Sequence, residues 1–165
     1  MNTPEPPSYP LQSPANDAGA PMDLALDLAR QASARGEVPV GCVIVDGRSG
    51  RILARAHNLT ETQTDPTAHA EILALREAAL HGGSPRLPDA DLYVTLEPCP
   101  MCAQAISFAR IRRLVFGAYD PKGGGVEHGP RIFDSTSCHH APEIIGGVRE
   151  TAAAALLQDF FKTRR

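Results

Sequence analysis

Two short motifs that carry metal-binding side chains constrain this chain more than any other feature. The first is His69-Ala70-Glu71 and the second is Pro98-Cys99-Pro100-Met101-Cys102. One imidazole and two thiolates supply three of the four ligands that zinc takes in a tetrahedral site. His69, Cys99 and Cys102 therefore predict a zinc site with one open position. Water bound there has its pKa lowered to about 7, so hydroxide is available at neutral pH.

The spacing within each motif decides whether its side chains can meet at one metal. Cys99 and Cys102 are three residues apart, so they share one face of a helical turn that begins at Pro100. His69 and Glu71 are two residues apart, and in a helix interior they would point to different sides. They can converge only where a helix begins, so we expect a helix start at each motif.

The sequence also marks where the helix of the first motif begins. Thr67, which follows Asp65-Pro66, is the predicted N-cap, and Ile72, Leu75 and Ala79 form the apolar stripe behind it. Glu71 then lies beside the metal without being needed as a ligand. We predict that it is the catalytic residue that carries protons.

A Cys-x-x-Cys pair also occurs in redox motifs and in closed four-ligand zinc sites. A closed site needs a further ligand, and Cys138 or His139 remains a candidate. The segment Cys138-His139-His140 is otherwise interpreted as a structural loop. The run Gly123-Gly124-Gly125 is only a weak match to a phosphate-binding loop, because no strand and helix flank it.

Composition bounds the domain organisation and the compartment. Residues 1–21 hold six of the fifteen prolines and no lysine or arginine, which predicts a disordered tail rather than a signal peptide. Residues 22–165 are then expected to form one domain. No apolar run is long enough to cross a membrane. Two of the four cysteines belong to the metal motif, and we interpret the others as reduced thiols of a cytoplasmic protein.

The charge of the chain is unevenly distributed. The formal net charge is −3, yet residues 110–165 hold 9 basic and 6 acidic side chains. A local basic surface of this kind can contact phosphates. On charge alone, however, a nucleic-acid partner is the minority interpretation.

Hydrophobic periodicity predicts an α/β protein. Helices are expected over residues 22–34, 67–81, 99–109 and 151–162, and strands over residues 40–45, 52–57, 92–95 and 114–117. The first two strands should form an antiparallel hairpin. The unit over 92–117 predicts a right-handed crossover between parallel strands, with the second motif where a strand ends and a helix begins.

Five segments carry a resemblance to a known family: residues 37–41, 65–71, 92–99, 115–118 and 159–161. In these segments the chain resembles the bacterial tRNA-specific adenosine deaminases of the cytidine deaminase-like superfamily. The two metal motifs alone match the superfamily signature H-x-E…P-C-x-x-C. Asp65-Pro66-Thr67, just before the first motif, and Asp159-Phe160-Phe161, near the end of the chain, narrow the resemblance from the superfamily to the tRNA-specific adenosine deaminases.

The resemblance implies a fold and an activity. The fold is a three-layer α/β/α arrangement with a five-stranded mixed sheet, in a homodimer with one Zn²⁺ per subunit. The activity is hydrolytic deamination of adenosine to inosine at the wobble position of a tRNA anticodon, in an arginine tRNA. Hydroxide attacks C6 of a flipped adenine while Glu71 shuttles protons.

The resemblance also implies the residues that bind the substrate. At the base, Asn58 would form a hydrogen bond, the backbone N–H of Ala70 would face the ring and Val38 would pack on it. Asp120 would lie near the ribose of the preceding nucleotide. Phe160 and Phe161 would lie near the anticodon loop. Simpler roles remain open. Asn58 and Asp120 can be turn residues, and the two phenylalanines can anchor the last helix.

Two other functions compete with this one. The same zinc chemistry can act on a free nucleobase or nucleoside such as guanine, cytosine or cytidine. Alternatively, the metal can hold together a domain without enzymatic activity.

Overall fold

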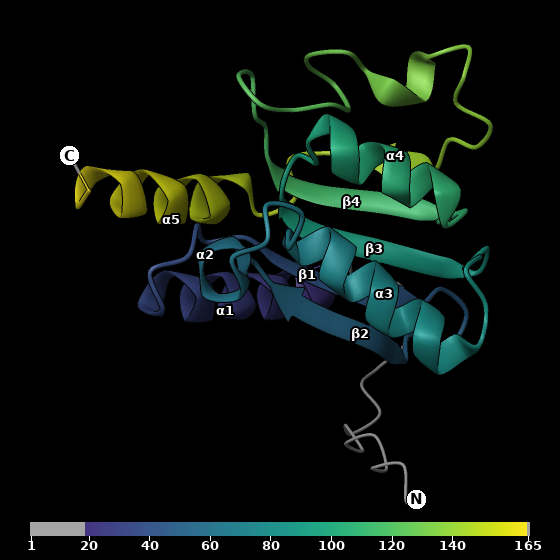
Figure 1. Ribbon diagram of the computed structural model, residues 1–165, viewed down its shortest axis with the longest axis horizontal. Helices are drawn as coiled ribbons and strands as arrows, with labels where there is room; N and C mark the ends of the chain where they lie inside the picture. The colour runs from purple at the N-terminus through teal and green to yellow at the C-terminus, as the bar shows by residue number, and fades with distance from the viewer. Residues whose placement is uncertain (1–18, 165) are drawn as a thin grey trace, which may run out of the picture.

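A computed structural model describes residues 19–164, in which a five-stranded mixed sheet lies between two layers of helices (Figure 1). The strand order is β2-β1-β3-β4-β5. The strands are β1 (Gly41–Asp46), β2 (Ile52–His57), β3 (Ala90–Leu96), β4 (Arg113–Ala118) and β5 (Glu143–Ile145). The helices are α1 (Gly19–Ala34), α2 (Thr60–Gln63), α3 (Ala70–Gly82), α4 (Pro100–Phe108) and α5 (Glu150–Lys162), with a short 3-10 helix at Ile132–Asp134. The predicted three-layer α/β/α architecture is confirmed.

Strand pairing confirms the predicted hairpin and the predicted parallel pair of strands. β1 pairs antiparallel with β2 on one side and with β3 on the other. β3 and β4 are parallel and joined through α4, and β4 and β5 are also parallel. The ends of β3 and β4 therefore meet at one edge of the sheet, where α4 begins. Figure 1 shows that α5 extends outward from this edge.

Alternation along the strands builds a separate core on each face of the sheet. Cys42 and Ile44 of β1 face α3 and α4, while Val43 and Val45 face α1. α5 packs against β4 and α1. Cys42 is fully buried, as the sequence predicted for a core thiol.

The backbone of α1 approaches β1 most closely at Gly41. A Cβ atom at this position would collide with the carbonyl oxygen of Ala25. Glycine therefore lets the helix lie directly on the strand.

Some boundaries differ from the sequence prediction. α1 begins at Gly19 rather than at Met22, so residues 19–21 are helical and not part of a tail; residues 1–18 of the predicted tail lie outside the described range. The expected loop before the first metal motif contains α2, and β5 was not predicted from the residues. Within the described range, no helix is long and apolar enough to span a bilayer.

Candidate active site

Three potential metal ligands meet between the starts of α3 and α4. The Nδ1 atom of His69 lies 3.7 Å from Sγ of Cys99 and 3.6 Å from Sγ of Cys102. A tetrahedral zinc with bonds of about 2.0 Å to nitrogen and about 2.3 Å to sulfur separates these atoms by about 3.5 Å. The donor set and its spacing therefore fit zinc. Within residues 19–164, this is the one cluster of three or more such side chains that could hold a metal ion.

Both predicted helix starts exist, and a candidate metal ligand occupies the N-cap position of each. His69 precedes α3 and Cys99 precedes α4, both with extended backbone, and neither side chain caps its own helix. Pro100 opens α4, as the spacing predicted. Two helix N-termini therefore direct partial positive charge toward the sulfurs, which favours their ionised form.

The predicted N-cap at Thr67 is wrong. The carboxylate of Asp65 accepts hydrogen bonds from the backbone N–H and the hydroxyl of Thr67, at 2.8 and 2.7 Å. The two residues form a turn that ends before the helix. This turn leads the chain into His69, which becomes the N-cap instead.

The two thiols interact strongly with each other. A hydrogen bond from Cys102 lowers the pKa of Cys99 to about 4, and the same hydrogen bond raises the pKa of Cys102 well above its usual value. One of the two sulfurs therefore keeps its proton when no cation is present. A divalent cation binds thiolates and displaces such a proton, so two thiols in this contact are suited to hold one.

Glu71 lies in the first turn of α3, beside the ligands. Its side chain is only 4% exposed, and burial raises its pKa to about 7. It is close enough to Cys102 to share a hydrogen bond with it. A carboxyl group with this pKa can both take and give a proton near neutral pH.

Asn58 follows β2 and is held by a carboxylate that the sequence analysis did not single out. Its side-chain nitrogen donates to Oε2 of Glu37 at 3.4 Å and to Oγ1 of Thr60 at 3.3 Å. A carboxylate only accepts hydrogen bonds, so the nitrogen of Asn58 must face Glu37. The carbonyl oxygen of Asn58 is thereby turned away from Glu37. Val38, which follows Glu37 in the sequence, is half-buried.

Glu37 itself is fully buried and organises α2. Its carboxylate accepts hydrogen bonds from the backbone N–H and hydroxyl of Thr62, at 2.6 and 2.8 Å, and from the N–H of Glu61 at 3.3 Å. Burial opposes ionisation, but these hydrogen bonds hold the pKa of Glu37 below its usual value. In the sequence Glu37 follows Arg35 and Gly36 at the start of an apolar stretch, where an acidic residue is ordinary, so nothing there marked it as buried.

Asp120 lies at the end of β4 and closes a turn. Its Oδ1 atom accepts hydrogen bonds from the N–H groups of Lys122 and Gly123, at 3.2 and 2.9 Å. The turn-residue role that the sequence left open is therefore present. Its side chain is half-buried, on the same edge of the sheet as the metal ligands.

The glycine run is explained by close packing. A Cβ atom on Gly124 would lie 2.5 Å from Oε1 of Glu97, and one on Gly125 would lie 2.6 Å from the nitrogen of Pro100. These glycines let the loop after Asp120 lie against the start of α4. Glu97 is the second buried carboxylate to which the sequence analysis gave no role.

The two phenylalanines of α5 differ in exposure. Phe160 is 6% exposed, and the guanidinium of Arg164 lies 3.7 Å from the centre of its ring. Phe161 is 49% exposed, and its ring meets that of Phe160 edge to face at 5.3 Å. Phe160 therefore anchors the helix, and Phe161 presents its ring to solvent.

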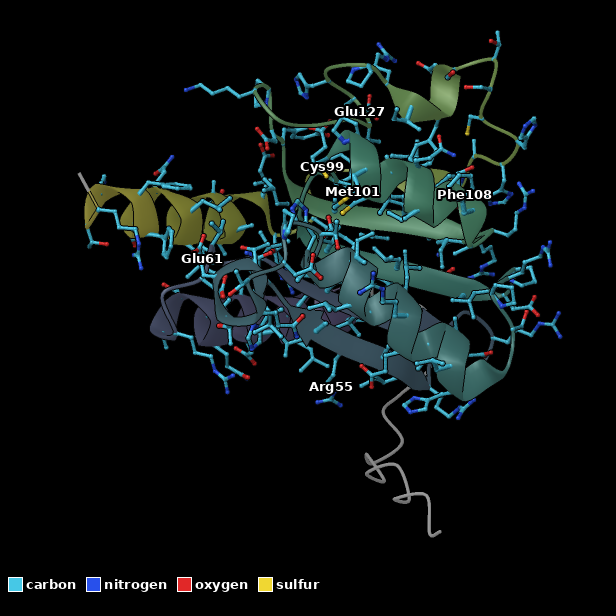
Figure 2. The ribbon with its side chains drawn as sticks, in the orientation of Figure 1. Arg55, Glu61, Cys99, Met101, Phe108 and Glu127 are labelled. Atoms are coloured by element: carbon cyan, nitrogen blue, oxygen red, sulfur yellow. The ribbon has the colours of Figure 1, made fainter. Side chains whose placement is uncertain are left out.

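The segment Cys138-His139-His140 lies away from the metal ligands. The thiol of Cys138 donates to the carbonyl of His140 at 3.1 Å, and Nε2 of His140 lies 2.6 Å from the carbonyl oxygen of Ile111. Ser107 also donates to the carbonyl of His140, at 2.6 Å. These contacts are at the far end of α4, which Figure 2 shows by the separation of Cys99 and Phe108. Neither Cys138 nor His139 belongs to the ligand cluster.

Comparisons with known proteins agree with this geometry. The family model described as the cytidine and deoxycytidylate deaminase zinc-binding region matches residues 16–118. A protein named tRNA-specific adenosine deaminase from Agrobacterium fabrum is 56% identical over 144 residues, which cover 87% of this chain and 93% of that protein.

Two solved structures are also similar. One comes from studies of A-to-I editing by tRNA:A34 deaminases at the wobble position of transfer RNA; it has a TM-score of 0.81 and 56% identity, over 83% of this chain and 98% of that one. The other is guanine deaminase from Bacillus subtilis, with a TM-score of 0.60 and 38% identity, over 62% of this chain and 65% of that one.

Proposed function

This chain belongs to the tRNA-specific adenosine deaminases within the cytidine and deoxycytidylate deaminase zinc-binding family, and we propose that it converts adenosine to inosine at the wobble position of a tRNA anticodon. Its fold is the cytidine deaminase-like fold. The observation that carries the chemistry is the buried carboxyl of Glu71 beside one imidazole and two thiols at zinc-ligand spacing.

In this proposal His69, Cys99 and Cys102 hold one zinc ion per subunit. Zinc supplies Lewis acidity when bound, which lowers the pKa of water toward about 7. As the water oxygen bonds to C6 of the adenine, Glu71 takes one proton from the water and gives it to N1. The same carboxyl then takes the remaining proton of the hydroxyl at C6 and gives it to the amino group. The C–N bond breaks, ammonia departs and the carbonyl of inosine is left at C6.

Other residues orient the base. The side-chain nitrogen of Asn58 is already engaged by Glu37, so its oxygen is the atom that accepts from the substrate. The backbone N–H of Ala70, at the first position of α3, has no partner within the helix and donates to the base. Val38 packs against the ring. These contacts keep the adenine still while protons move at N1 and at the amino group.

The remaining contacts serve the RNA. Asp120 lies near the ribose of the preceding nucleotide, and Phe161 meets the anticodon loop, with Phe160 supporting it from behind. We further propose an arginine tRNA as the substrate, a homodimer as the assembly and the cytoplasm as the location, where tRNA is found and thiols stay reduced. All four cysteines are free in this structure.

A direct assay separates this function from deamination of a free base. Purified protein is incubated with an anticodon stem-loop carrying adenine at the wobble position, and in parallel with guanine, adenosine and cytidine. We expect equal amounts of inosine and ammonia from the RNA, and neither product from a stem-loop with guanine at that position. Ammonia from a free base, with none from the RNA, would establish the alternative suggested by the similarity to guanine deaminase.

A further inference from the structure

Glu97, at the end of β3 and two residues before Cys99, is a buried carboxylate with an unusual set of partners. Its side chain has no exposed surface. Five hydrogen bonds converge on it from one loop: Oε2 accepts from the N–H of Asp120 at 2.9 Å and from Nδ1 of His128 at 2.9 Å, and Oε1 accepts from the N–H groups of Glu127 at 2.8 Å, His128 at 3.0 Å and Val126 at 3.3 Å.

Only an ionised carboxylate satisfies all these donors. Both oxygens of Glu97 face N–H groups, and a carboxylate is the side chain that accepts at both ends and donates at neither. Among residues 19–164 its one ion-pair partner is the imidazole of His128.

The loop that Glu97 holds is residues 120–128. It is pressed onto the turn that carries the zinc ligands, because Gly124 and Gly125 have no side chain to keep it away. The N–H of Gly125 also donates to the carbonyl of Pro98 at 2.8 Å. The side chain of Glu97 therefore adds to these backbone contacts and fixes the N–H of Asp120 relative to the turn at Cys99.

We propose that Glu97 is a positioning residue that sets the RNA-contacting loop 120–128 against the zinc-bearing turn, so that the site accepts adenine only within a polynucleotide. This inference rests on the proposed function, in which Asp120 meets the preceding ribose. Glu97 touches neither the base nor the metal ligands through its hydrogen bonds. It acts on binding of the nucleotides beside the base and leaves the proton transfers to Glu71.

The test compares Glu97→Gln with Glu77→Gln. Glu77 lies on α3, outside the loop and outside the residues assigned to the base or the RNA, so the same substitution there is the control. A glutamine at 97 turns an NH₂ group toward N–H donors and releases the loop. We expect KM for the stem-loop to rise about tenfold, the effect of one lost charge-assisted contact. The kcat should stay within about twofold, and the zinc content at one per chain. Glu77→Gln should match the wild type.

A second pair of variants guards against misfolding of Glu97→Gln. His128→Leu removes the ring contact to Glu97, and His128→Asn restores a nitrogen donor near the same place. We expect KM for the stem-loop to rise in His128→Leu and to return toward the wild-type value in His128→Asn. An unchanged KM in both Glu97→Gln and His128→Leu would refute the positioning role, as would an equal loss of zinc and kcat.

The backbone amides give a readout that does not depend on turnover. Hydrogen exchange at Val126, Glu127 and His128 should be slow in the wild type and fast in Glu97→Gln. Equal exchange in the two proteins would refute the anchoring. A wild type with slow exchange but no activity on RNA would instead refute the proposed function, and with it the role of the loop in selecting RNA.

Discussion

Replacing Glu71 with glutamine removes the group that carries protons and preserves the shape of the site. Glutamine has the same length and fits the same volume. It cannot take a proton from water or return one to the base. His69, Cys99 and Cys102 are untouched, so we expect the variant to bind zinc as the wild type does.

The burial of Glu71 sets the size of the effect. Loss of a general acid–base group lowers kcat by roughly 10²- to 10⁴-fold. The side chain is 4% exposed, so bulk water cannot replace it, and we expect the upper part of that range, about 10³- to 10⁴-fold. This corresponds to about 4–5.5 kcal/mol in the activation free energy.

Stability should move differently from activity. Burial raises the pKa of Glu71 to about 7, which means that its charged form is held unfavourably in the folded protein. Glutamine carries no charge. The free energy of unfolding should therefore stay within about 1 kcal/mol of the wild type or increase, as often happens when a functional polar group is removed.

The assay is single-turnover deamination of the stem-loop, with zinc content and thermal unfolding measured on the same sample. Glu77→Gln is the control, because Glu77 lies on α3 and is only half-buried. A Glu71→Gln variant that deaminates within tenfold of the wild type would refute the proton-transfer role. Loss of zinc in this variant would show that Glu71 holds the metal.

Three further predictions concern stability and metal binding. Gly125→Ala should lower the free energy of unfolding by about 1–3 kcal/mol, since its Cβ would meet fixed backbone of Pro100, whereas Gly82→Ala meets no atom closer than 3.9 Å and should do no harm; thermal unfolding compares them. Cys102→Ser should lose zinc by metal analysis and Cys138→Ser should keep it; the reverse would mean a different ligand set. Glu37→Gln should be less stable than the wild type above pH 4.5, and this difference should shrink as the pH falls below that value. The reason is that the lowered pKa of Glu37 stabilises the fold only while the carboxylate is ionised. A difference in the free energy of unfolding that stays constant with pH in denaturant titrations contradicts this.

The sequence predicted what depends on local pattern. Hairpin and crossover followed from alternating strands and their spacing, and the helix start at Cys99 followed from Pro100. The sequence did not predict β5, because three residues are too few to show a period. The sequence analysis placed the N-cap of α3 at Thr67. It missed that the side chain of Asp65 holds Thr67 in a turn before the helix, because such a turn leaves no periodic pattern in the sequence.

The buried carboxylates were missed for a different reason. Glu97 contacts residues 23 to 31 positions away, and most of its partners are backbone N–H groups, which every residue has. No residue type marks such a contact in a sequence. The unequal roles of Phe160 and Phe161, by contrast, follow from helical geometry, because neighbouring residues on a helix point in directions about 100° apart.

The long connection from β4 to β5 is held at three places. Glu97 binds its beginning, and Nε2 of His140 lies against the carbonyl of Ile111 at its end. Between them, the N–H of Ile132 donates to the carbonyl of Gly125 at 2.8 Å, and Ile132 and Phe133 pack against the core. Residues 135–137 are exposed and can change in length or sequence with little effect on the metal-bearing turn. This stretch is where an engineer, or natural divergence, can graft a new recognition element onto an unaltered catalytic centre.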